Sequence, residues 1–149
     1  MHNRTSLTQG LLVWIGILGL LPGLAPAEDE LLQPDQAFRI AGQAEGARAV
    51  NVEWTIADGY YMYRDKLKFE SDTPGIEVGT PSLPEALIRE DEFFGKVPIY
   101  RDRLRLQLPL ERQPGAAETL TLQVRSQGCA DRGICYPPHT QTILVELPA

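Results

Sequence analysis

Two cysteines, Cys129 and Cys135, are the residues of this chain whose type and spacing can do chemistry. Five residues separate them, one of which is Gly133, so a hairpin or a wide loop can bring them together. A disulfide needs Cα atoms about 4.4–6.8 Å apart, and such a loop can meet that distance. Paired thiols of this kind can exchange with a partner: one thiolate attacks a disulfide sulfur, and the other resolves the mixed disulfide. The spacing therefore permits redox chemistry.

Two other uses of the cysteines fit the same spacing. In an exported protein the pair could be a purely structural disulfide, although so short a loop gains only about 2.4 kcal/mol from chain entropy, against about 4.7 kcal/mol for a 100-residue loop. Alternatively, Cys129, Cys135 and His139 could bind a metal, with Asp131 as a weak fourth ligand. A closed zinc site needs four well-placed nitrogen or sulfur ligands, so we expect no metal.

Length and composition narrow the class of protein. The chain has 149 residues, which allows one domain, and 43% of them are hydrophobic, as in a folded protein. Asp and Glu number 20 against 14 Lys and Arg, for a formal net charge of −6. This balance excludes a broad electrostatic binder of nucleic acid. The sequence also contains no glycine-rich phosphate loop and no zinc-protease histidine pair.

The first 27 residues are typical of a secretory signal peptide. Arg4 precedes an apolar run over residues 11–24, and the run ends in the small-residue pattern Ala25-Pro26-Ala27. The run is shorter than the roughly 20 apolar residues that a membrane-spanning helix needs. We therefore predict cleavage after Ala27 and an exported domain over residues 28–149, with its core at about 33–147 and no membrane span. Disulfides can form in that compartment.

The dominant hydrophobic period in the remaining sequence is two, which indicates half-buried strands. Strands are predicted at residues 50–56, 60–64, 67–70, 76–78, 97–100, 104–110, 120–124 and 142–147. One helical turn is expected within residues 84–91. Many short strands with turn signals every 8–12 residues favour an all-β fold, an immunoglobulin-like antiparallel β-sandwich, with a small barrel as the alternative. No helix is expected after Cys129, so no helix N-terminus would stabilise a thiolate there.

The cysteine segment, Gly128-Cys129-Ala130-Asp131-x-Gly133-x-Cys135-Tyr136-Pro137-Pro138, resembles the active-site segment of a known family. That family is the N-terminal periplasmic domain of the thiol:disulfide interchange protein DsbD. Three further segments resemble it in order and spacing: an aromatic strand at residues 58–64, a cap loop at 90–96, and the strand at 99–104. The resemblance covers nearly all of residues 28–149.

This resemblance implies an immunoglobulin-like fold and assigns roles to particular residues. Cys135 would form mixed disulfides with partners and Cys129 would resolve them. The cap loop would consist of Asp91, Glu92, Phe93, Phe94 and Gly95. Phe93 would cover the pair as a lid, and Tyr61 and Tyr63 would line the site. An aromatic lid would exclude oxidants, and nearby carboxylates would disfavour the thiolate and slow unwanted exchange.

The resemblance also implies partners and a compartment. Electrons would come from a thioredoxin-like donor domain and pass, in the periplasm, to thioredoxin-fold clients such as a disulfide isomerase and a cytochrome c maturation thiol-reductase. No cofactor is expected besides the disulfide itself. DsbD continues into a membrane-embedded conduit and a thioredoxin-like domain, whereas this sequence stops at Ala149. The sequence is therefore either a stand-alone homologue, whose donor would be a separate protein, or an excerpt of a longer protein. The alternative is a non-catalytic exported β-sandwich that binds a partner and carries a structural disulfide.

Overall fold

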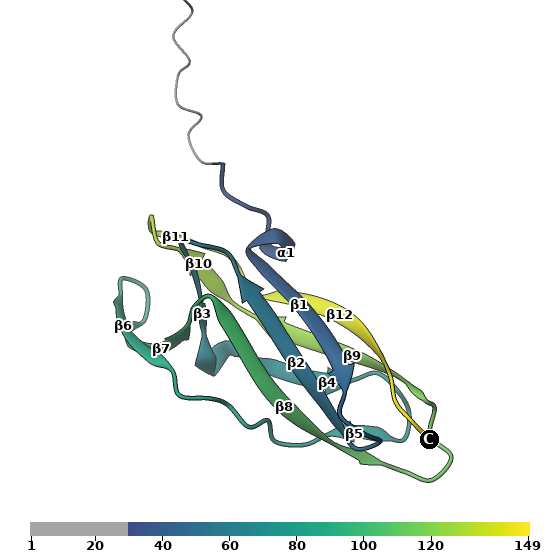
Figure 1. The fold of residues 1–149 in the computed structure, drawn as a ribbon. Helices are drawn as coiled ribbons and strands as arrows, with labels where there is room; N and C mark the ends of the chain where they lie inside the picture. The colour runs from purple at the N-terminus through teal and green to yellow at the C-terminus, as the bar shows by residue number, and fades with distance from the viewer. Residues whose placement is uncertain (1–29) are drawn as a thin grey trace, which may run out of the picture. The chain divides into compact units, whose positions relative to one another are not determined.

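The computed structural model describes residues 30–149, and the predicted signal peptide lies outside the described residues. A short helix, α1 (Pro34–Ala37), leads into antiparallel strands that form three hydrogen-bonded sheets (Figure 1). A single 3-10 turn, η1 (Arg64–Lys66), follows the third strand. Within residues 30–149, no helix has both the length and the apolar character needed to span a membrane.

The first sheet has four strands in the order β1-β2-β8-β5. Their bounds are Phe38–Ala44 for β1, Ala49–Ile56 for β2, Arg103–Arg112 for β8 and Ile76–Val78 for β5. Alternate residues of β2 and β8 point into the core, and β8 buries every second position from Leu104 to Leu110. This period-two burial is what the sequence pattern predicts for a sheet with one face packed and one face in water.

A second sheet, of order β12-β9-β4, covers the apolar face of the first. Its strands are β12 (His139–Glu146), β9 (Thr119–Ser126) and β4 (Lys68–Ser71). Trp54 of β2 meets Phe69 of β4 edge to face with ring centroids 6.0 Å apart. One contiguous apolar core joins the two sheets. The predicted immunoglobulin-like β-sandwich is therefore confirmed, and the barrel alternative is wrong.

The third sheet, of order β11-β10-β3-β7-β6, lies at one end of the molecule and positions the cysteines (Figure 1). Its strands are β11 (Ile134–Cys135), β10 (Gly128–Ala130), β3 (Tyr60–Tyr63), β7 (Gly95–Tyr100) and β6 (Leu87–Asp91). Only Gln127 separates β10 from β9 of the sandwich, and a short turn joins β2 to β3. The cysteine segment is thus a direct continuation of core strands.

The sequence prediction was wrong at residues 84–91, where it expected a helical turn. Residues Leu87–Asp91 form β6, which pairs with β7 from Leu87↔Ile99 to Asp91↔Gly95. The strand lies at the edge of its sheet, and Leu87 and Ile88 are 60% and 70% exposed. Because neither residue points into the core, the alternation that marks a strand is missing from this segment.

Candidate functional site

The two cysteines lie opposite each other on a small hairpin. Strands β10 and β11 are joined by the three residues 131–133, and Cys129 pairs with Cys135 across the ladder. Gly133 has φ of +87°, and its amide donates to the carbonyl of Ala130 at 3.0 Å. A three-residue hairpin loop commonly closes with a residue of positive φ, a role for which glycine is suited. The Cα atoms of the cysteines are 4.0 Å apart, and the sulfurs form a disulfide.

The environments of the two sulfurs differ. Cys129 is completely buried because β10 lies between β11 and β3. Gly128, next to it, approaches so closely that a Cβ atom there would collide with the Phe38 ring and the Tyr61 carbonyl. Cys135 lies on the edge strand and is partly exposed. Cys135 is therefore the more accessible of the two cysteines.

Two tyrosines of β3 lie beneath the disulfide. Tyr61 pairs with Cys129 in the ladder, and Tyr61 and Tyr63 point to the same side of the strand with their rings edge to face, 5.6 Å apart. The Tyr63 hydroxyl oxygen lies 3.0 Å from Sγ of Cys129 and 3.6 Å from Sγ of Cys135. Both side chains are at least 97% buried. The structure thus places both tyrosines beside the two cysteines.

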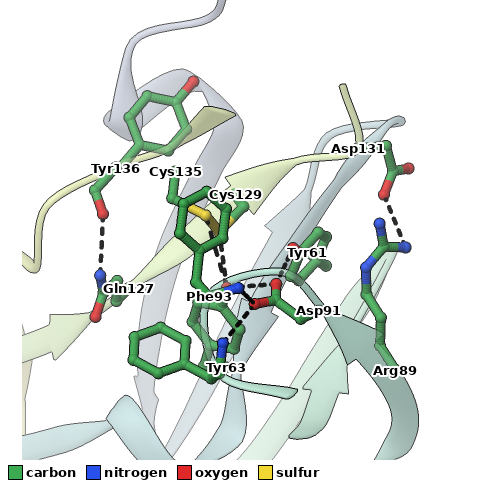
Figure 2. The surroundings of a disulfide bond; sticks show 11 residues. Tyr61, Tyr63, Arg89, Asp91, Phe93, Gln127, Cys129, Asp131, Cys135 and Tyr136 are labelled. Atoms are coloured by element: carbon green, nitrogen blue, oxygen red, sulfur yellow. Dashed lines mark hydrogen bonds and ion pairs between the residues drawn. A yellow bond between two sulfur atoms is a disulfide. The ribbon is translucent and has the colours of Figure 1, made fainter. Parts of the chain in front are cut away.

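A buried carboxylate, that of Asp91, connects the tyrosines to the cap loop (Figure 2). Its Oδ2 accepts hydrogen bonds from the hydroxyl of Tyr63, at 2.6 Å, and from the hydroxyl of Tyr61. Its Oδ1 accepts from the amides of Phe93 and Phe94, at 2.7 and 3.0 Å. Asp91 is the last residue of β6, so one side chain joins the end of that strand, the loop after it, and β3.

The hydrogen bonds to Asp91 determine the charge of its carboxyl group. Burial alone would raise the pKa of Asp91, but the four donors together hold that pKa below its ordinary value. Burial and the neighbouring carboxylate raise the pKa of both Tyr61 and Tyr63. At neutral pH the cluster of Asp91, Tyr61 and Tyr63 therefore consists of one carboxylate and two neutral phenols. A carboxylate oxygen of Asp91 and the two sulfurs all lie within 4.8 Å of one another.

The cap loop links β6 to β7 and exposes two aromatic rings. Gly95, with φ of +72°, ends the loop. Phe94 is 45% exposed and packs edge-on against Tyr63 at 5.0 Å. Phe93 is 54% exposed, and its ring crosses in front of the disulfide in the view of Figure 2. Glu92 is exposed and borders a groove of about 410 Å³ between this loop and the turn of the cysteine hairpin.

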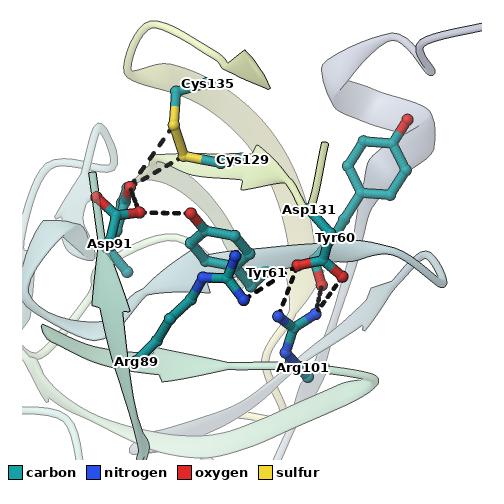
Figure 3. Close-up of polar contacts among 9 residues, drawn as sticks. Tyr60, Tyr61, Arg89, Asp91, Arg101, Cys129, Asp131 and Cys135 are labelled. Carbon is teal, nitrogen blue, oxygen red and sulfur yellow. Dashed lines mark hydrogen bonds and ion pairs between the residues drawn. A yellow bond between two sulfur atoms is a disulfide. The ribbon is translucent and has the colours of Figure 1, made fainter. Parts of the chain in front are cut away.

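A second polar cluster borders the same groove, and the sequence analysis missed it (Figure 3). Asp131, in the turn of the cysteine hairpin, binds the guanidinium of Arg101 through two hydrogen bonds of 2.9 and 2.7 Å. Arg89 of β6 lies 3.4 Å from the same carboxylate. Because the three residues come from separate elements, no local spacing marks them. The only available signal was the match of the segments around Arg101 and Asp131 to one family.

The metal-binding alternative of the sequence analysis does not match the observed geometry. His139 lies with its Nε2 atom 2.8 Å from Asp35, and Asp131 is bound to arginine. The carboxylate that the structure groups with the two sulfurs is instead that of Asp91, whose oxygens already accept four hydrogen bonds.

Known proteins match most of this chain. The family model described as "Thiol:disulfide interchange protein DsbD, N-terminal" matches residues 28–147. The chain is 40% identical over 119 residues to the DsbD proteins of Escherichia coli K12 and of Shigella boydii serotype 4. These matches cover 80% of this chain but 20% of each relative, so the chain spans about a fifth of their length.

Solved structures show the same fold. The reduced N-terminal domain of Neisseria meningitidis DsbD aligns with a TM-score of 0.64 at 36% identity, over 78% of this chain and 90% of that one. A complex between the DsbD and PilB N-terminal domains of the same species aligns with a TM-score of 0.60 at 33% identity, over 78% and 88%. The chain therefore belongs to the family of the DsbD N-terminal domain, and its two cysteines, Cys129 and Cys135, form a disulfide.

Proposed function

We propose that this chain is a periplasmic electron-relay domain that is reduced by a thioredoxin-like donor and in turn reduces thioredoxin-fold clients. The observation that carries the proposal is the unequal burial of the two cysteines, with Cys135 partly exposed at a sheet edge and Cys129 fully buried on the neighbouring strand. An exchange reaction needs one sulfur that a partner can reach and a second that is held close enough to resolve the intermediate.

The proposed reaction is a two-electron exchange in two displacements. In the reduced domain, the Cys135 thiolate attacks the client disulfide, whose S–S bond breaks, and a mixed disulfide forms as one client thiolate leaves. The Cys129 thiolate then attacks Sγ of Cys135, and the second client thiolate leaves. The domain ends as the disulfide seen here, and the client, after taking up two protons, ends as a dithiol. The donor dithiol restores the reduced domain by the reverse sequence.

Asp91 and Tyr63 would control the thiols between encounters. The Tyr63 hydroxyl donates to Asp91, so its oxygen can accept a hydrogen bond from a Cys129 thiol 3.0 Å away once the pair is reduced. The carboxylate charge nearby would disfavour a thiolate at either sulfur. The reduced pair would therefore react slowly until a docked partner changes this environment, which suits a relay that must not lose electrons to solvent oxidants.

Phe93 would act as the lid of the pair. Its backbone amide is tied to Asp91 while its ring remains 54% exposed, so the ring can move without breaking the loop's anchor. Docking of a partner would displace the ring and open Cys135. The complex of the Neisseria DsbD and PilB N-terminal domains supports a protein as the partner. The signal peptide predicted over residues 1–27 supports export to the periplasm.

A redox titration of residues 28–149 in graded dithiol/disulfide buffers, read by thiol alkylation, tests the proposed function. We expect a midpoint of about −200 to −250 mV, between the potentials of thioredoxin and of disulfide isomerases. A midpoint below about −300 mV would mark a structural disulfide. The non-catalytic binding module would then be the better interpretation.

Single-cysteine variants test the assigned roles. Cys129→Ser should form a stable mixed disulfide with an oxidised thioredoxin-fold isomerase, because Cys135 can attack and nothing resolves the product. Cys135→Ser should trap at least tenfold less, since Cys129 is fully buried. Non-reducing gels of the two reactions provide the measurement. Equal trapping by both variants would overturn the assignment.

Asp91→Asn tests the proposed carboxylate effect. Removing the charge should raise the alkylation rate of the reduced pair at pH 7 about threefold to tenfold, because a nearby negative charge disfavours the thiolate. The matched control is Glu92→Gln, which removes a charge of the same sign from an exposed position of the same loop and should change the rate less than twofold. Equal effects of the two substitutions would contradict a specific role for Asp91.

Phe93→Ala tests the lid. Oxidation of the reduced pair by hydrogen peroxide should become several-fold faster, because the ring would no longer shield the sulfurs. Leu144→Ala is the control, since Leu144 is 67% exposed on β12 of the second sheet. If Phe93→Ala and the control oxidise at the rate of the unsubstituted domain, Phe93 is not a lid.

A further inference from the structure

Asp131 occupies the turn of the cysteine hairpin and is held there from both its backbone and its side chain. Its amide donates to the carbonyl of Gly59 at 2.7 Å. Its carboxylate accepts the two-pronged hydrogen bonds of Arg101 and lies 3.4 Å from Arg89. Arg101 immediately follows β7, and Arg89 belongs to β6. The carboxylate thus ties the turn between the cysteines to the hairpin that bears the cap loop.

The two arginines are themselves held in place. Their guanidinium carbons lie 4.6 and 5.2 Å from the centroid of the Tyr61 ring, for Arg89 and Arg101 respectively (Figure 3). Arg101 also donates to the carbonyl of Tyr60 at 3.3 Å. The side chains of Arg101 and Arg89 are 24% and 33% exposed. An ion pair that is bidentate, stacked on an aromatic ring and partly shielded from water is stronger than an ordinary surface pair.

Strand β11 itself contributes little to holding the hairpin once the disulfide opens. Strand β11 contains only Ile134 and Cys135 and pairs only with β10, through two residue pairs. Beyond it, Tyr136 is buried, packs against the rings of Phe38 and Tyr60, and donates its amide to the carbonyl of Gly128 at 3.0 Å. Tyr136 therefore holds the chain just after Cys135. A two-residue edge strand offers little cooperative stability of its own. In the reduced state, the position of Cys135 relative to Cys129 therefore depends on Tyr136 after the strand and on what holds the turn before it.

We propose that Asp131 and Arg101, supported by Arg89, are positioning residues that hold the reduced cysteine hairpin in its disulfide-ready shape. This inference rests on the proposed redox function and adds a determinant of the equilibrium between dithiol and disulfide. A dithiol that is already positioned loses less conformational entropy when the S–S bond forms. The ion pairs therefore favour the disulfide over the dithiol, which makes the reduced domain a better electron donor.

Asp131→Asn and Arg101→Gln test the proposal because they change the local charge in opposite directions. If the ion pair acts by positioning, both variants should lower the equilibrium constant for disulfide formation by about threefold to tenfold. By the two-electron relation, in which tenfold corresponds to 29.6 mV, the midpoint would become about 14 to 30 mV less negative. If the residues acted only through their charges, the two midpoints would move in opposite directions, and the proposal would be wrong.

Two further variants distinguish a shared positioning interaction from independent effects of the single substitutions. Asp131→Asn combined with Arg101→Gln should shift the midpoint no further than the larger single shift, because both remove the same interaction. Arg101→Lys keeps the charge but loses the two-pronged geometry. Its midpoint should therefore lie between those of Arg101→Gln and the unsubstituted domain. Additive shifts in the double variant would count against a shared interaction.

The matched control is Glu53→Gln, which removes another carboxylate bound by arginine. Glu53 of β2 accepts from Nε of Arg105 of β8 at 2.8 Å, on the first sheet of the sandwich. This variant should leave the midpoint unchanged. Thermal unfolding of each variant in both redox states shows whether the variant is folded. If Asp131→Asn or Arg101→Gln does not fold, the midpoint of Arg101→Lys still tests the proposal. Unchanged midpoints in folded Asp131 and Arg101 variants would overturn this inference while leaving the function of the unsubstituted domain intact.

Discussion

The site depends on one buried carboxylate that is satisfied by four hydrogen bonds. Asp91 lies at the end of β6, and its donors come from β3 and from the cap loop. Burying a carboxylate without partners is costly, so each donor must be in place for the charge to persist there. The same bonds orient the Tyr63 hydroxyl toward the sulfurs. The positions of the cap loop, the tyrosines and the disulfide are therefore not independent of one another.

The sandwich provides rigid strands for two small hairpins that face each other across the groove. One hairpin carries the cysteines and the other the cap loop, and in each three residues join the strands. A glycine of positive φ is the last of these residues in the cysteine hairpin, Gly133, and the first residue of the next strand in the other, Gly95. Both hairpins belong to the sheet that contains β3. Reactive groups held on strands are positioned more accurately than groups on free loops. Phe93 differs from these groups, since its backbone amide is bound to Asp91 while the residue is 54% exposed.

The sequence predicted the sandwich well where strands bury one face. Strands β2, β8 and β9 place an apolar residue at nearly every second position, so their period of two predicts them as strands. β1 was missed because Gly42 and Ala44 occupy positions where larger apolar residues would reveal the alternation. β10 and β11 are too short to show any period.

The cysteines were identifiable from type and spacing, whereas the roles of Tyr61, Tyr63 and Asp91 came only from the family resemblance. Contacts such as Arg101–Asp131 join residues 30 apart, and only the folded sheet brings them together.

The two acidic residues of the site differ in the partners that surround them. Asp91 is bound by neutral donors, so its charge is solvated by the protein but not cancelled, and it remains within 4.8 Å of both sulfurs. Asp131 is bound by two arginines, which lower its pKa and compensate its charge. Under the proposed function, Asp91 therefore acts on the charge felt by the thiols, and Asp131 acts on the shape of the loop that carries them. A thiolate population governs the rate of exchange, and the positioning of a dithiol governs its equilibrium. Separate residues would thus set how fast the domain reacts and how strongly it reduces, so that either property could change without the other.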